Sequence, residues 1–102
     1  RVLFRSDLLN LLIDAGFLDE AARLVRPLMA GSPPPEVLLT AARLAERRGE
    51  LASARALLDT AQATASPALR ARVHEVRAEL ETRAGNLYRA QLEREAAQHL
   101  HP

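Results

Sequence analysis

Three short segments of the chain share one pattern, a glycine followed two residues later by leucine and five residues later by alanine. The pattern begins at Gly16, Gly49 and Gly85, so its copies lie 33 and 36 residues apart. Glycine can end a helix in a left-handed conformation that costs other residues a steric penalty. The leucine then begins the returning helix, and the alanine suits a close crossing of two helices. The repeat therefore predicts three helix hairpins of similar length, with Ala21, Ala54 and Ala90 in helix contacts.

Between these turns, apolar residues recur every three to four positions, which is the spacing of one helix face. Val73, Val76 and Leu80 are an example, and no segment of the sequence shows sustained strand-like alternation. The predicted fold class is all-α, with Pro27 kinking the second helix or unwinding one turn of it. The predicted helices span residues 7–15, 18–30, 36–48, 51–63, 68–84 and 87–100.

This pattern resembles the tetratricopeptide repeat (TPR), a unit of about 34 residues that forms one helix hairpin. In the third repeat only Ala78 and Ala90 fit the family pattern well. The matching positions in the first two repeats are Leu8, Leu12, Ala21, Val25, Pro33, Leu38, Ala42, Ala45, Ala54 and Leu58. The resemblance implies an alpha-alpha superhelix, a right-handed solenoid of three antiparallel hairpins at about residues 7–31, 36–64 and 68–100. Other helical repeats of similar period are the alternative.

The third hairpin departs from the family pattern, because Arg77, Glu81 and Arg94 stand where apolar residues are usual. The last predicted helix is also polar over most of its surface, as expected of a terminal cap that meets water. We therefore expect the third hairpin to be a degenerate or capping repeat. The chain is interpreted as the C-terminal fragment of a longer, bacterial-type repeat protein.

The first predicted helix is apolar nearly all round, and such a helix is normally buried on several sides. One hairpin partner cannot cover Leu8, Leu9, Leu11, Leu12 and Ile13 together. An exposed apolar patch marks an interaction surface. We therefore expect a neighbouring repeat to cover this helix, and the chain to self-associate through it when that neighbour is missing.

The opening hexapeptide, residues 1–6, has the sequence Arg-Val-Leu-Phe-Arg-Ser and contains no initiator methionine. It resembles the translated end of a common sequencing adapter, and the alternative is a natural segment that matches by chance. We interpret residues 1–6 as a non-native leader, which is left out of fold reasoning. Residues 7–102 are then a single TPR-like domain.

The composition excludes several classes of function. The net charge is only +1, which gives no reason to expect nucleic acid as a partner. No apolar run approaches the roughly 18 residues that a membrane span needs, so membrane insertion is not expected. All 14 basic residues are arginine, and we attribute this to a GC-rich genome rather than to phosphate recognition. The chain has no cysteine, which leaves the compartment, cytoplasmic or periplasmic, undetermined.

No residue pattern indicates catalysis, a metal or a cofactor. His99 and His101 are two positions apart, so on a helix they point in different directions and cannot form an i, i+4 metal pair. The serines lack a recognisable triad motif, and no glycine-rich motif for phosphate is present. Glu75 and Glu79 share a helix face, and nearby arginines at positions 72 and 83 suggest surface ion pairs along that helix.

The TPR resemblance implies that the first helix of each hairpin lines a concave groove. The residues expected to face this groove are Asn10, Asp14, Glu36, Arg43, Arg47, Glu75, Glu79 and Arg83. The expected function is that of a non-catalytic scaffold that binds a protein or peptide there, although a solvated helix face would show the same residues. The alternative function is an accessory assembly or regulatory domain of a larger enzyme or of a secretion or envelope protein.

Overall fold

The computed structural model describes residues 6–100, and within this range all regular structure is helical. Five of the six predicted helices have ends within one residue of the prediction, and the second, predicted for 18–30, is an α-helix only to Val25 and continues as a 3-10 turn to Met29. The all-α prediction is therefore confirmed. The predicted leader lies outside the described residues except for Ser6. The elements are α1 (Ser6–Ala15), α2 (Leu18–Val25), the 3-10 turn η1 (Arg26–Met29), α3 (Pro35–Arg47), α4 (Leu51–Thr64), α5 (Pro67–Arg83) and α6 (Leu87–His99).

The second helix changes character at Pro27, as the sequence predicts. Regular α-helix ends at Val25, and the chain continues as the tighter turn η1 with Pro27 near its start. Proline has no N–H to donate and its ring clashes with the carbonyl four residues earlier, so an α-helix cannot continue regularly through it. The second helix therefore loses its last regular turn.

The three repeated glycines all adopt the left-handed conformation, with φ of +89° at Gly16, +80° at Gly49 and +84° at Gly85. In each turn the N–H of the next residue donates to the carbonyl five residues earlier. The bond from Glu50 N to Ala45 O, at 2.9 Å, is one of the three. A side chain at these positions would strain the backbone. The repeated sequence pattern therefore corresponds to a repeated turn geometry.

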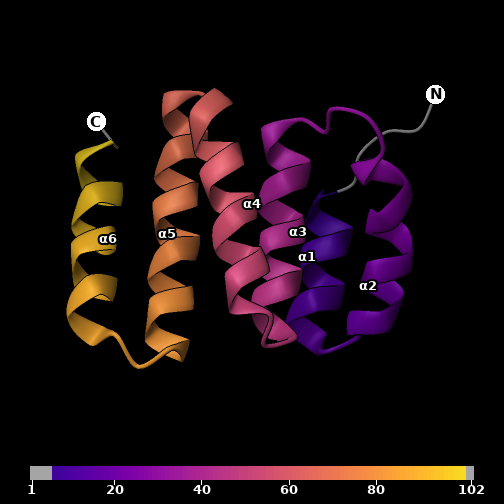
Figure 1. Cartoon of the computed structure of the whole chain (residues 1–102), viewed down its shortest axis with the longest axis horizontal. Helices are drawn as coiled ribbons and strands as arrows, with labels where there is room; N and C mark the ends of the chain where they lie inside the picture. The colour runs from indigo at the N-terminus through magenta and orange to yellow at the C-terminus, as the bar shows by residue number, and fades with distance from the viewer. Residues whose placement is uncertain (1–5, 101–102) are drawn as a thin grey trace.

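Consecutive helices pack in pairs, α1 with α2, α3 with α4 and α5 with α6, as Figure 1 shows. The first helices of these pairs also contact one another, because α3 contacts both α1 and α5. Among the described helices, α6 contacts α5 alone. The first helices of the three pairs thus form a continuous row along the molecule.

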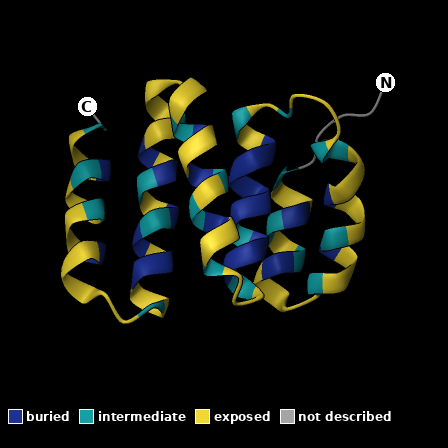
Figure 2. Ribbon diagram, viewed as in Figure 1, coloured by how far each residue is buried: buried dark blue, intermediate teal, exposed yellow. Residues whose placement is uncertain are grey.

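Helix α3 is the centre of the core, and Figure 2 shows it buried along most of its length. One apolar cluster joins α1 and α2 to α3, and a second joins α3 to α4 and α5. Ala21, Ala54 and Ala90 have no exposed surface, as predicted for close helix contacts. In α6 the buried residues are both alanine, Ala90 and Ala97, which lets this helix approach α5 closely.

The two ends of the stack are only partly as expected. In α1, Leu9 and Ile13 are buried while Leu8 and Leu11 are exposed, which confirms that this helix is not fully covered. The last helix was expected to be polar over most of its surface, and α6 also exposes large apolar side chains that this expectation did not include. They are Leu87, Tyr88 and Leu92. They are exposed because α6 packs on α5 alone among the described helices, and the sequence does not show which side of the helix that contact covers.

Candidate functional site

Arg43 in α3 is the centre of a polar network on the row of first helices. Its Nη1 donates to Asn10 Oδ1 and its Nη2 donates to Asp14 Oδ1, both at 2.6 Å. Its Nε lies 3.9 Å from Glu79 Oε1 in α5. The side chain is only 15% exposed, and charged hydrogen bonds of this kind are stronger where water is restricted. Arg43 therefore ties α3 to the helices on both of its sides.

Two further arginines of the predicted groove join the same face. Arg47 Nη1 lies 3.8 Å from Asp14 Oδ1, and Arg83 in α5 pairs with Glu46 in α3. The surface ion pairs expected along α5 itself are not found among the described residues, because Glu79 and Arg83 pair with residues of α3 instead. That prediction is wrong because neighbouring first helices lie close enough to compete for these side chains.

Glu46 is a member of this network that the sequence analysis missed. Its side chain is 3% exposed, and burial raises its pKa above the ordinary value of 4.5. The nearby charge of Glu79 raises the pKa further, while Arg83 and Arg43 oppose the shift. Its burial could have been predicted from its position four residues after Ala42, which places it on the same helix face as core residues.

A cavity of about 500 Å³ is lined by residues of α3, α5 and α6. Val76 and Ala78 supply apolar walls, and charged side chains supply the remainder. The charged lining residues are Arg43, Arg72, Glu75, Glu79 and Arg94. Arg43, Glu75 and Glu79 were predicted for the groove, whereas Arg72 and Arg94 were not. Arg94 was missed because it comes from α6, a second helix of its hairpin.

Glu36 is the predicted groove residue that the structure leaves apart from the others. It is exposed in the first turn of α3 and belongs neither to the described ion pairs nor to the cavity lining. Its backbone carbonyl accepts a hydrogen bond from Thr40 Oγ1 at 3.2 Å. The structure therefore brings together seven of the eight predicted residues, those on α1, on the later turns of α3 and on α5.

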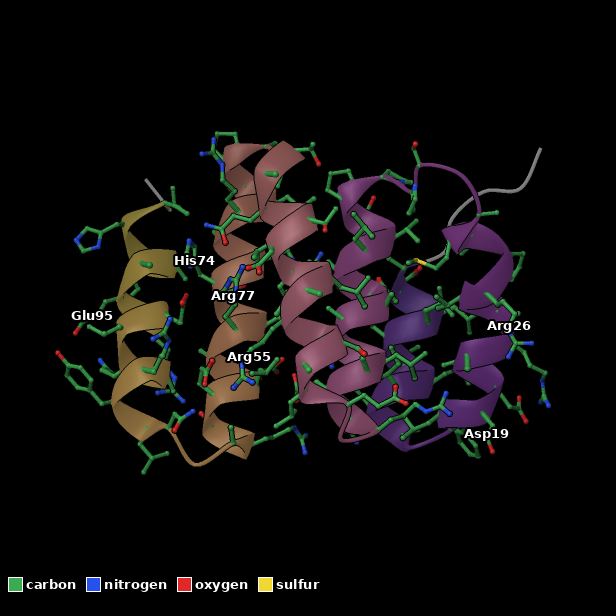
Figure 3. All side chains as sticks on the ribbon, in the orientation of Figure 1. Asp19, Arg26, Arg55, His74, Arg77 and Glu95 are labelled. Atoms are coloured by element: carbon green, nitrogen blue, oxygen red, sulfur yellow. The ribbon has the colours of Figure 1, made fainter. Side chains whose placement is uncertain are left out.

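The opposite face carries a second polar network that explains two departures from the repeat pattern. Arg77 Nη2 donates to Asp59 Oδ1 at 2.6 Å, and Arg55 Nη2 donates to Glu81 Oε1 at 3.2 Å. Figure 3 shows both arginines between α4 and α5. Asn86 Nδ2 also donates to Glu81 Oε1, at 2.9 Å. Arg77 and Glu81 thus join helices through ion pairs at positions where the family pattern has apolar contacts.

Burial alone would raise the pKa of Glu81, but hydrogen bonds from Asn86 and Arg55 and the charges of Arg55 and Arg89 lower it below 4.5. Glu46 and Glu81 are therefore two buried carboxyl groups with pKa shifts in opposite directions. A lowered pKa stabilises the fold above the unfolded pKa and loses this effect as pH falls. A raised pKa stabilises the fold below the unfolded pKa and loses this effect as pH rises.

We expect Glu81→Gln to reduce the free energy of unfolding by about 1 kcal/mol at neutral pH, because it weakens the charged hydrogen bonds. Glu46→Gln should increase that free energy at neutral pH, because it removes a buried charge. Both differences from the wild-type protein should shrink near pH 3.5, where the carboxyl groups take up protons. Urea unfolding at the two pH values measures this. Equal effects of the two substitutions at neutral pH would contradict the opposite shifts.

His74 is half-buried, and its Nδ1 lies 2.7 Å from Glu93 Oε2, which joins α5 to α6. Residues 6–100 contain no group of three or more acidic, histidine or cysteine side chains that could hold a metal ion. Within the same range, no helix is long and apolar enough to cross a membrane. Comparison with protein-family models, curated proteins and solved structures finds no match for this chain.

Proposed function

We propose that this chain is a non-catalytic scaffold that holds a protein or peptide against the face formed by α1, α3 and α5. We further propose that its fold is a right-handed TPR-like solenoid, in which this face is the concave groove. The repeat periods of 33 and 36 residues support that fold, as do the three equivalent glycine turns and the continuous row of first helices.

The observation that carries the proposal is the cavity of about 500 Å³ beside Arg43. Its walls combine the apolar side chains of Val76 and Ala78 with charged groups of both signs. Protein-binding surfaces commonly have an apolar centre with a polar rim. Such a lining suits a peptide, which offers apolar side chains together with hydrogen-bonding backbone groups.

Charges remain available at the cavity for a bound segment. Arg72 and Glu75 have no ion-pair partner among residues 6–100, and both line the cavity. Arg94 Nη2 donates to Thr82 Oγ1 at 3.1 Å and has no carboxylate partner in the same range. We therefore expect a bound peptide to carry an acidic side chain near an arginine and a basic one near Glu75.

The polar network also supports the proposal, because it holds the groove in one shape. Arg43 joins α1 to α3 and α5, and the pair of Arg83 with Glu46 adds a second link between α3 and α5. A binding surface that is already ordered loses less conformational entropy when its partner docks. The network therefore favours binding by keeping the groove ordered, even where its residues do not contact the partner themselves.

The test is selection of peptides from a displayed random library against the wild-type chain. Amide chemical shifts should change mainly on α1, α3 and α5 when a selected peptide binds. Glu75→Arg should change the dissociation constant by about tenfold, in a direction set by the peptide's own charge. Glu95→Arg is the matched control, because Glu95 is exposed on α6 and does not line the cavity.

Failure to select any peptide above background would contradict the proposal. Shift changes confined to α2, α4 and the outer side of α6 would also contradict it, because the bound peptide would then lie on the other face. An equal effect of Glu75→Arg and Glu95→Arg would indicate a general charge effect rather than contact in the cavity.

A further inference from the structure

Three exposed apolar side chains occupy positions that the repeat makes equivalent to covered ones. They are Leu8 and Leu11 in α1, which are 45% and 67% exposed, and Leu24 in α2, which is 46% exposed. The 33-residue period that separates Gly16 from Gly49 maps these three residues onto Ala41, Leu44 and Leu57. We name Leu8, Leu11 and Leu24 the N-terminal face.

The second hairpin shows what covers such a face. Ala41 and Leu44 are each 7% exposed in the cluster that joins α3 to α1 and α2, and Leu57 packs against the same cluster. The residues that receive them are Leu9, Ile13, Ala21 and Val25. We name these four residues the apolar seat. The second hairpin thus docks on the apolar seat of the first through Ala41, Leu44 and Leu57. The equivalent three positions of the first hairpin are the ones that remain exposed.

The C-terminal end of a second copy does not offer an equivalent seat. The 33- and 36-residue periods carry the seat residues Ile13 and Val25 to Thr82 and Arg94, which are both exposed. Head-to-tail stacking of two copies would place leucines of the N-terminal face against the hydroxyl group of Thr82 and the charge of Arg94. Burying a charge without a partner costs far more than burying a leucine gains.

Pairing of two N-terminal faces is also disfavoured by charge. Asp7 is exposed on α1 and has no ion-pair partner among residues 6–100, and this helix contains no basic residue. Two such helices packed together would bring acidic groups of the same sign near one another, which is destabilising. Neither arrangement of two copies supplies the contacts that the second hairpin makes with the first, so we prefer a further hairpin to the self-association that the sequence led us to expect.

We propose that the N-terminal face docks a further helix hairpin of the same repeat type, which presents an apolar seat equivalent to that of Leu9, Ile13 and Val25. The contacts follow the register of the second hairpin on the first. Leu8 and Leu11 of α1 insert as Ala41 and Leu44 of α3 do. Leu24 of α2 inserts as Leu57 of α4 does. This surface is distinct from the groove and does not depend on what the groove binds.

A single thiol reports directly on whether the N-terminal face is covered. The chain has no cysteine, so Leu11→Cys introduces the only thiol. The same substitution at Leu92, which is 47% exposed on α6, is the matched control. An extended chain carries a duplicate of residues 7–39 directly ahead of Asp7, which continues the 33-residue register and supplies the apolar seat.

We expect the rate of thiol labelling at position 11 to fall by about tenfold or more in the extended chain, because the duplicated hairpin covers the face. The rate at position 92 should be the same in both chains. Val25→Lys in the duplicated segment alone should restore fast labelling at position 11, because it places a charge in the seat.

An unchanged labelling rate at position 11 in the extended chain would overturn the proposal. Protection that persists with Val25→Lys in the duplicate would overturn it too, since the seat would then not be the contact. If labelling at position 11 of the unextended chain slows as its concentration rises, a second copy covers the face instead.

Discussion

The substitution Ala54→Glu should lower the free energy of unfolding by more than about 2 kcal/mol. Ala54 has no exposed surface and lies in the apolar cluster shared by α3, α4 and α5. A glutamate there must either bury its carboxyl group in that cluster or push two helices apart. For a domain of this length, the melting temperature should fall by about 8 °C or more.

Ala56→Glu is the matched control for this experiment, because it makes the same chemical change in the same helix at an exposed position. It should change the free energy of unfolding by no more than about 0.5 kcal/mol. Thermal melts followed by circular dichroism measure both variants. If the melting temperatures of Ala54→Glu and Ala56→Glu both equal that of the wild-type protein, α4 does not cross its neighbours at the repeated alanine.

A second large effect is expected at the other end of the core. Ile13→Ala should cost about 3 kcal/mol, because it removes a fully buried side chain from the cluster of α1, α2 and α3. The two apolar clusters meet only through α3 and a few residues that border both. The loss should therefore be concentrated in the first hairpin, as in repeat proteins whose units contact only their neighbours.

Hydrogen exchange followed residue by residue tests this localisation. Amides of α1 and α2 should lose protection in Ile13→Ala, while those of α5 keep most of theirs. Leu11→Ala is the control, because Leu11 is 67% exposed in the same helix and should cost no more than about 0.5 kcal/mol. Uniform loss of protection from α1 to α6 would show that the chain unfolds as one unit.

The fold class and the helix boundaries could be predicted because their causes are local. Gly49 ends a helix through its own left-handed conformation, and Pro27 interrupts one through its missing N–H. Apolar spacing then indicates which side of each helix is buried, as with Val73 and Leu80. These properties belong to short stretches of sequence and need no knowledge of distant residues.

The candidate site could be predicted only in part. Most of the expected groove residues do lie on one face, because a helix places residues three or four apart on the same side. Their partners were not predictable, since Arg43 meets Asp14 and Glu79 across distances of 29 and 36 residues in the chain. Which of several nearby carboxylates an arginine chooses depends on how closely two helices approach.

The sequence by itself determined where the helices begin and end and where they must cross closely, because turn conformation and side-chain size act locally. Only the tertiary structure decided which charges are buried and which apolar residues stay exposed. Glu46 is buried because α5 brings Arg83 to it, and Leu92 is exposed because α6 packs on α5 alone. Burial depends on how helices pack against one another, and it cannot be derived from the order of residues within one helix.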